Sequence, residues 1–345
     1  MLELLAKVSI GRPVTAAEAW KPGRASEAIV LYNMAEAVEL FHRGPLHNPV
    51  LVKAVTRAGQ RMTISSVLDT LSMRGSLDLH DFSKQLEKSN DGSLINVHMP
   101  DRYPSAEAVR IFNERRNSGG LPVNLLNLGC LKENAIPAYD CLVFQLLASK
   151  GAAHLQHVGR LGVYTTALTE EGRKLWLVWP GLELEELGTH EVPDGGVAVL
   201  VDEGDMLIQP PNTLHAPIAL EDTLMTGTMH WHSSHLLDIL RHTKAQVIDP
   251  VLTNETMSRQ FLPKVKSLLR QWEVDLADPT KTPLYTWPPA ESLAECIKIV
   301  QWLDDGCKGC TRRSNGQDGE QAQGWAGLRA GNEEELAEQI MGQRG

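Results

Sequence analysis

The sequence lacks any long hydrophobic run. No apolar stretch in its 345 residues approaches the length that a membrane-spanning helix needs. The first residues also lack a basic segment followed by a long apolar one, so we expect no secretory signal. Both absences argue against a membrane role and lead us to expect an intracellular protein, in the cytoplasm or the nucleus.

Cysteine and positive charge are also scarce. The five cysteines stand at irregular spacing, which does not resemble a disulfide framework and is consistent with a reducing compartment. Lysine and arginine together number 33 against 43 aspartates and glutamates, which gives a net charge of −10. A dedicated nucleic-acid binder that relies on a basic field is therefore not expected.

The hydrophobic pattern divides the chain into four parts and predicts an α+β fold. Residues 1–120 are expected to form a mainly helical layer, and residues 233–306 to form further helices that pack on a core. Residues 121–232 carry short alternating runs bounded by Gly, Pro, Asn and Asp, which is typical of antiparallel strands in a sandwich or barrel. Residues 307–345 are expected to be a flexible polar tail with a short terminal helix.

Individual elements follow from the same patterns. Helical spacing of apolar residues predicts helices over 26–43, 62–73, 79–89, 105–118, 233–246, 254–274 and 290–306. Alternation predicts a strand over 93–99, and eight short runs between residues 122 and 231 predict the strands of the core.

Polar residues in the central part stand in an order that indicates a binding site. His157 lies early in this part, His215 lies late, and Lys174 lies between them just before an apolar run. Two histidines on strands of one barrel can converge on a metal ion, and neutral imidazole suits iron, zinc, copper or nickel. A lysine that faces inward from a barrel wall can hold the carboxylate of an organic acid.

The order of these residues resembles the JmjC domain, the cupin-like double-stranded β-helix, or jelly roll, of iron(II) and 2-oxoglutarate dependent oxygenases. The resemblance extends over about 80 residues and rests on five pieces in the family's order: His157-Val158-Gly159, Gly172-Arg173-Lys174-Leu175-Trp176, Gly204-Asp205, Pro211-Asn212-Thr213-Leu214-His215, and the pair Thr228 and His230. Each piece alone is a weak signal, whereas the combination in order is fairly specific.

The resemblance implies a set of roles. His157 and His215 would be the catalytic iron ligands, and Lys174 would pair with the distal carboxylate of 2-oxoglutarate. Thr228 would line or support this co-substrate, and His230 stands where the family often places an asparagine near it. The cofactors would be Fe(II) and 2-oxoglutarate, and the reaction would be C–H oxidation of the hydroxylase or demethylase type. The substrate would be a protein side chain, including a methyl-lysine, or a small molecule.

The sequence departs from the family pattern at the carboxylate ligand, which Gly159 replaces. The iron site of these oxygenases needs two histidines and a carboxylate. Four explanations stay open. The protein is a non-catalytic barrel that binds a partner or a small acid, another carboxylate such as Glu170, Glu171 or Asp205 supplies the ligand, a water fills the position, or a halide such as chloride binds iron there, as in related halogenases.

Simpler interpretations accompany the site residues. His154, three residues before His157, is the alternative first ligand, but the distance from His157 to Lys174 agrees better with the family pattern. His215 has an alternative as an ordinary turn histidine, and Lys174 as a solvated lysine of an edge strand or a packed one.

Two further groups of residues resemble metal sites. His230 and His232 would share one face of a strand, so joint metal binding is geometrically allowed. Cys307 and Cys310 form a single CxxC pair, with Cys296 as the nearest third thiol. Strong zinc signals have two such pairs, so a pair without metal is the simpler interpretation.

Overall fold

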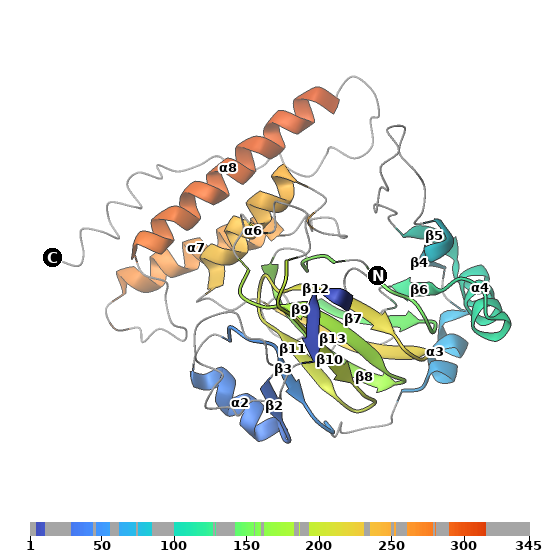
Figure 1. Cartoon of the computed structure of the whole chain (residues 1–345). Helices are drawn as coiled ribbons and strands as arrows, with labels where there is room; N and C mark the ends of the chain where they lie inside the picture. Colours follow the sequence, from blue (N-terminus) through green and yellow to red (C-terminus); the bar gives the residue numbers. More distant parts are fainter. Residues whose placement is uncertain are drawn as a thin grey trace.

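The computed structural model describes most of the chain, and its fold is α+β. The described residues are 5–10, 29–43, 46–55, 62–73, 75–84, 100–126, 128, 142–154, 156–159, 162–182, 186, 193–230, 235–249, 252, 261–278, 280 and 290–314. Within them, two β-sheets form the centre of the molecule and six α-helices surround it (Figure 1).

The larger sheet has nine strands in the described residues, in the order β2-β3-β11-β8-β13-β7-β6-β4-β5. These strands are β2 (Ile29–Leu31), β3 (Val50–Val52), β4 (Ser76–Asp81), β5 (Asp101–Pro104), β6 (Val123–Leu126), β7 (Leu142–Ala148), β8 (Tyr164–Glu171), β11 (Met206–Gln209) and β13 (Thr223–His230). Neighbours pair antiparallel except β2 and β3, which run parallel.

The smaller sheet has four strands in the described part of the chain, in the order β1-β10-β9-β12. These strands are β1 (Val8–Ile10), β9 (Lys174–Trp179), β10 (Gly196–Val201) and β12 (Leu214–Ala219). Strand β9 lies between β10 and β12 and pairs antiparallel with both, so its side chains lie at the centre of this sheet.

A hydrophobic core joins the two sheets. Trp176 and Val178 of β9 belong to the same buried cluster as residues from four strands of the larger sheet: Leu51 of β3, Ala167 of β8, Leu207 of β11 and Met225 of β13. Side chains alternate between the two faces of a strand. The face of each sheet that carries these core residues is therefore called its inner face below.

Helices α3 (Ile64–Leu71) and α4 (Ser105–Ser118) cover the other face of the larger sheet beside β4, β6 and β7. Helix α3 begins with a capping box, in which the side chains of Thr63 and Ser66 each accept a hydrogen bond from the other residue's backbone N–H. Helix α4 ends at Gly119, whose φ of 67° allows the left-handed conformation of a C-terminal cap. Helix α2 (Met34–Arg43) packs against β2 and β3.

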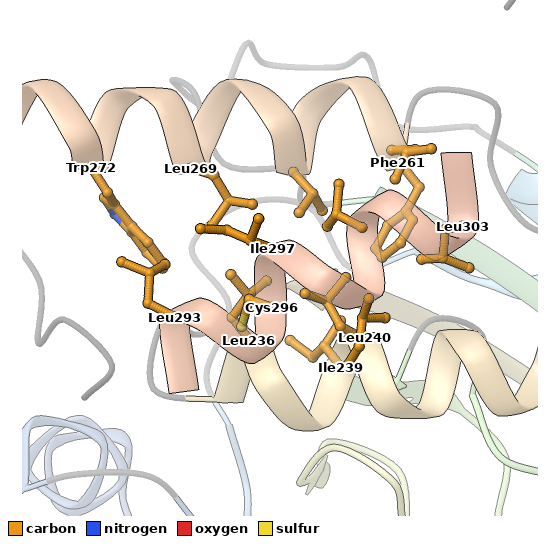
Figure 2. Close-up of a cluster of buried hydrophobic side chains, with 14 of the residues drawn as sticks. Leu236, Ile239, Leu240, Phe261, Leu269, Trp272, Leu293, Cys296, Ile297 and Leu303 are labelled. Atoms are coloured by element: carbon orange, nitrogen blue, oxygen red, sulfur yellow. The ribbon is translucent and has the colours of Figure 1, made fainter. Parts of the chain in front are cut away.

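Helices α6 (Leu236–Ile248), α7 (Phe261–Ala277) and α8 (Ala290–Ser314) form a layer on the opposite side from α3 and α4 (Figure 1). Figure 2 shows their apolar side chains pointing toward one another, with Leu240 from α6, Leu269 from α7 and Ile297 from α8 in one cluster. No helix in the described residues combines the length and the apolar character needed to cross a membrane.

The structure confirms the α+β class, and several predicted elements agree with it. The helix predicted over 105–118 coincides with α4, and those predicted over 62–73, 233–246, 254–274 and 290–306 overlap α3, α6, α7 and α8. The predicted central strands correspond to β6 to β13. The strand predicted over 93–99 lies outside the described residues.

Other elements differ from the prediction. The helix predicted over 79–89 is wrong at its start, because β4 continues to Asp81 and a 3-10 turn follows over Phe82–Lys84. Residues 29–31, within the helix predicted over 26–43, form β2. Besides its helices, the N-terminal part supplies β1 to β5, and three of these strands have only three residues, too few to display alternation in the sequence. Helix α8 continues through Cys307 and Cys310, whose side chains lie outside the described part.

Candidate functional site

The structure places His157 and His215 side by side. The segment that precedes β8 runs antiparallel to β12, and the two histidines form an isolated bridge within it. Each backbone N–H donates to the carbonyl oxygen of the other residue, with N–O distances of 3.0 Å in both directions. The centroids of the two imidazole rings lie 4.3 Å apart. Two residues that are 58 positions apart in sequence are therefore neighbours.

Both histidines project from the inner face of the smaller sheet. His215 pairs with Val178 of β9, and Val178 lies in the core between the sheets. Directly paired residues on neighbouring strands point to the same side, so His215 faces the core, as does His157 beside it. The two predicted iron ligands therefore share one surface.

The surroundings of His215 fix its tautomer. Its Nδ1 lies 2.9 Å from the carbonyl oxygen of Thr213, which can only accept, so Nδ1–H donates. Burial, with a smaller contribution from the neighbouring His157, lowers the pKa of His215 to about 3, which keeps the ring neutral. The lone pair then resides on Nε2, and a neutral imidazole oriented through its other nitrogen is the form that binds metals.

Lys174 lies on the same inner face, at the start of β9. Four residues separate it from Val178, so the alternation of side chains brings both to one side of the strand. Its Cα is about 13 Å along the strand from the level of His215, at about 3.3 Å per residue. An extended lysine side chain and a five-carbon dicarboxylic acid, placed end to end, together span about the same distance as that between Lys174 and the level of His215.

The environment of Lys174 is unusual for a lysine. The residue is only 3% exposed, and its ammonium group forms no hydrogen bond or ion pair within the described residues. Burial lowers its pKa to about 7. A buried lysine without a partner is costly, and such groups are found where a ligand or a catalytic step requires them.

Gly159 leaves room where the family places a carboxylate. Among the described residues, a Cβ atom at this position would meet only Oγ1 of Thr165, at 3.8 Å, which is an ordinary contact. The carbonyl oxygen of Gly159 accepts a hydrogen bond from Nε2 of Gln246 in α6, at 3.2 Å. Its φ is outside the left-handed range. Glycine is therefore not required here by the backbone.

The three carboxylates considered as replacements lie away from Gly159. Glu171 accepts a hydrogen bond from the backbone of Ile64 at the start of α3, at 2.6 Å. Asp205 accepts hydrogen bonds from Lys53 and from the backbone of Ala54.

Glu170 stands five residues from Thr165 on β8, which corresponds to about 17 Å along the strand. Thr165 is the residue of β8 that faces Gly159. In the described residues, no group of three or more His, Cys, Asp and Glu side chains is arranged to hold a metal ion.

Two buried donors on the inner face were not identified from the sequence. Gln209 pairs with Thr165 and stands two residues after Leu207 of the core, so its side chain shares the inner face. Its Nε2 is buried without a hydrogen-bond partner in the described structure, as is Nε1 of Trp176. The Trp176 ring lies 5.5 Å from the ring of His215. The sequence feature that could have identified Gln209 as a site residue is its position directly before the proline turn that leads to His215.

His154 has a different environment from His157. Its Nε2 lies 2.5 Å from Nδ2 of Asn124, and its ring is tilted against that of His80 and meets that of Phe82 edge-on. Burial and the neighbouring histidines hold its pKa well below the usual range. Because Asn124 engages its ring and His157 faces His215, the geometry favours His157 as the first ligand.

Thr228 and His230 are not brought together with the other site residues. Thr228 pairs with Thr166, and their hydroxyl groups form a hydrogen bond. The adjacent pair, Gly227 and Ala167, occupies the inner face, so Thr228 points to the other side. His230 shares that side and stacks on Tyr164 at 5.3 Å. His232 lies outside the described residues.

Two comparisons with known proteins found no match. No protein-family model matches this chain, and no curated protein matches it significantly. The assignment of the site therefore rests on its own geometry.

Proposed function

We propose that the chain is a JmjC-like protein of the iron(II) and 2-oxoglutarate dependent oxygenase type, built on a double-stranded β-helix. In this proposal His157 and His215 hold iron and Lys174 binds the distal carboxylate of 2-oxoglutarate. The observation that carries the proposal is the common inner face of these three residues, which stand on separate segments of the chain.

Hydrogen-bond donors on the inner face that lack acceptors in the described part of the chain favour an anionic ligand. Lys174, Gln209 and Trp176 are donors, and the atoms in question have no acceptor in the described part of the chain. Buried donors without acceptors are costly, so an interior that carries several of them complements a ligand with carboxylate oxygens. The two imidazoles add the nitrogen ligands that iron accepts.

The residues of the chain have separate tasks in this arrangement. The Thr213 carbonyl orients His215 for metal binding. A carboxylate beside Lys174 raises the pKa of its ammonium group, so the bound acid and a protonated lysine stabilise each other in a site with little water. When bound, iron(II) and 2-oxoglutarate supply oxygen-dependent oxidation of a C–H bond, with succinate and carbon dioxide as by-products.

The second candidate is a non-catalytic protein that binds a small acid. Gly159 supplies no ligand, and Glu170, Glu171 and Asp205 lie elsewhere. In this case Lys174 and the other donors retain the acid while the histidine pair holds no metal. A water or a chloride ion in the open position at Gly159 is the alternative that keeps the oxygenase chemistry.

An anaerobic titration separates these candidates. The protein is titrated with Fe(II) and 2-oxoglutarate, with and without chloride, and the visible charge-transfer band of the chelated pair is recorded. His157→Ala removes one proposed ligand, and His47→Ala is the matched control because the His47 side chain is exposed and its segment does not pair with β12. The oxygenase proposal requires a band in the wild type and in His47→Ala that disappears in His157→Ala.

Other outcomes have a defined meaning. Stabilisation by 2-oxoglutarate without a band or bound metal would replace the oxygenase proposal with the acid-binding one. A chloride-dependent band would place a halide at the third position. If neither the metal nor the acid binds, both candidates are wrong.

A further inference from the structure

A pocket of about 900 Å³ lies beside α6, and neither the two histidines nor the lysine of the inner face lines it. Its walls come from α6, α8, residues 46–47, Gly181 and Leu182 after β9, and residues 210–212 before β12. Pockets of roughly 300–1,000 Å³ take ligands of small-molecule size. The described structure therefore contains a space beside α6 that is large enough for a ligand.

Helix α6 packs on the segment that follows His157 and also lines the pocket. Gln246 of α6 binds the carbonyl oxygen of Gly159, and Gly162 packs against His242, one turn earlier on the same helix. His242 lines the pocket, as does Asn212, another neighbour of Gly162. Because His157, His215 and Lys174 do not line the pocket, its occupant would contact a different set of side chains from those of the inner face.

His242 is an unpartnered polar group in the pocket wall. It is 5% exposed, and its ring has no hydrogen bond within the described residues. Burial lowers its pKa to about 3, so the ring is neutral near pH 7. A neutral imidazole has one nitrogen that accepts hydrogen bonds. Because the ring lines the pocket, a ligand that donates a hydrogen bond would satisfy it.

Asp238 supplies negative charge one turn before His242. Its carboxylate lies 3.5 Å from Nδ1 of His235, and that hydrogen bond is the main reason why its pKa is lowered. No lysine or arginine in the described part of the chain forms an ion pair with Asp238. About half of its side chain is exposed. The carboxylate is therefore ionised and accessible from the pocket.

Arg241 and Lys244 also line the pocket, and each contacts another side chain. Nε and one terminal nitrogen of Arg241 each lie 2.8 Å from a carboxylate oxygen of Glu295, so this pair neutralises itself. The Lys244 ammonium group lies over the ring of Trp302, 5.0 Å from its centroid. The charge of Arg241 helps to lower the pKa of Asp238, but within the described residues neither Arg241 nor Lys244 forms an ion pair with this carboxylate, so its oxygens can accept hydrogen bonds from a ligand cation.

We propose that this pocket binds a primary amine on an apolar stem. The ammonium group donates to Asp238 and to the acceptor nitrogen of His242. The stem packs on apolar wall residues, among them Leu46, Leu182 and Ile299. This binding does not depend on iron or on 2-oxoglutarate.

The test compares two probes with the same stem and opposite charge, n-hexylamine and hexanoate, by isothermal titration calorimetry. Hexylamine is expected to bind the wild type and hexanoate is not. Asp238→Asn should weaken hexylamine binding about ten-fold, because the ammonium group then donates to a neutral amide oxygen in place of a carboxylate. Asp275→Asn is the matched control, since Asp275 lies on the exposed side of α7 and binds Gln271.

Asp238→Glu keeps the charge and should retain most of the affinity, which separates loss of charge from loss of structure. The proposal is overturned if hexanoate binds as well as hexylamine, because Arg241 and Lys244 would then govern the pocket. It is also overturned if Asp238→Asn and Asp275→Asn behave alike, or if neither probe binds.

Discussion

The inner-face site and the pocket beside α6 both contain charged side chains, but the two sites should bind ligands of opposite charge. On the inner face, Lys174 is buried and its ammonium group has no acceptor within the described residues. In the pocket, Arg241 is bonded to Glu295, and the ion pair of Asp238 within the described residues is with the imidazole of His235. The first site offers donors without acceptors, and the second offers a carboxylate that forms no ion pair with a lysine or arginine in the described part of the chain. The charge of the ligand that each site should bind thus depends on which charged side chain lacks an ion-pair partner, more than on which residue types are present.

Gly159→Asp should have the largest effect on the difference between the two sites. It adds a carboxylate to the segment that carries His157 and should increase the Fe(II) affinity of the inner-face site. A Cβ atom at Gly159 meets only Thr165, at an ordinary distance, so the side chain is accommodated. Loss of an outer-shell partner alone changes metal affinity about 10–100-fold. A new direct ligand should therefore raise the Fe(II) affinity by at least about 100-fold, measured by anaerobic calorimetry.

Gly75→Asp is the control for this substitution. A Cβ atom at Gly75 has no neighbour within 4 Å, and its φ is also outside the left-handed range. This variant adds the same charge away from β9 and β12 and should leave Fe(II) affinity unchanged. Equal affinities in the two variants would mean that the metal position is not beside Gly159.

Lys174→Met removes the buried ammonium group from the inner-face site. Its effect on protein stability depends on pH. The pKa of Lys174 is about 7 in the folded protein and 10.5 when unperturbed. Between these values the unfolded chain binds more protons at this residue, so the folded wild type gains stability as pH rises through the window. At pH 7 the variant avoids the cost of the buried amine and should be more stable by roughly 2–4 kcal/mol.

Urea unfolding at several pH values from 6 to about 10.5 measures this difference, which should shrink as pH rises. The same variant should lose stabilisation by 2-oxoglutarate, because the acid no longer meets an ammonium group. Lys150→Met, at an exposed turn, should change neither property. A difference that grows with pH, or stabilisation by the acid that persists, would contradict the assigned role of Lys174.

The sequence predicted the part of the site that depends on ordered motifs. The spacing of His157, Lys174 and His215 identified three residues that the structure brings to one inner face. The strand pattern of the central part predicted β6 to β13 for the same reason, because alternating side chains leave a direct mark in the sequence.

The rest depends on register and on contacts between distant segments. The pairing of β13 with β8 shifts between Leu224 and Met225, and the resulting register places Thr228 on the side away from the histidines. A slip of one residue reverses the faces of a strand, and no motif in the sequence reports it. The pocket beside α6 combines five segments, so it could not be predicted from any one of them.

Gln209→Leu should have the smallest effect of these substitutions. It is informative because it should change protein stability and 2-oxoglutarate affinity in opposite directions. Nε2 of Gln209 is buried without a partner in the described structure, so replacing the amide removes an unsatisfied group and should raise stability by about 1 kcal/mol. If that amide serves a bound acid, the same change should weaken 2-oxoglutarate binding about 2–10-fold, the size of one neutral hydrogen bond. Gln271→Leu on the exposed face of α7 should alter neither quantity. Stability and affinity that move in opposite directions would identify an unsatisfied donor kept for a ligand, whereas a loss of both would assign Gln209 to packing between the sheets.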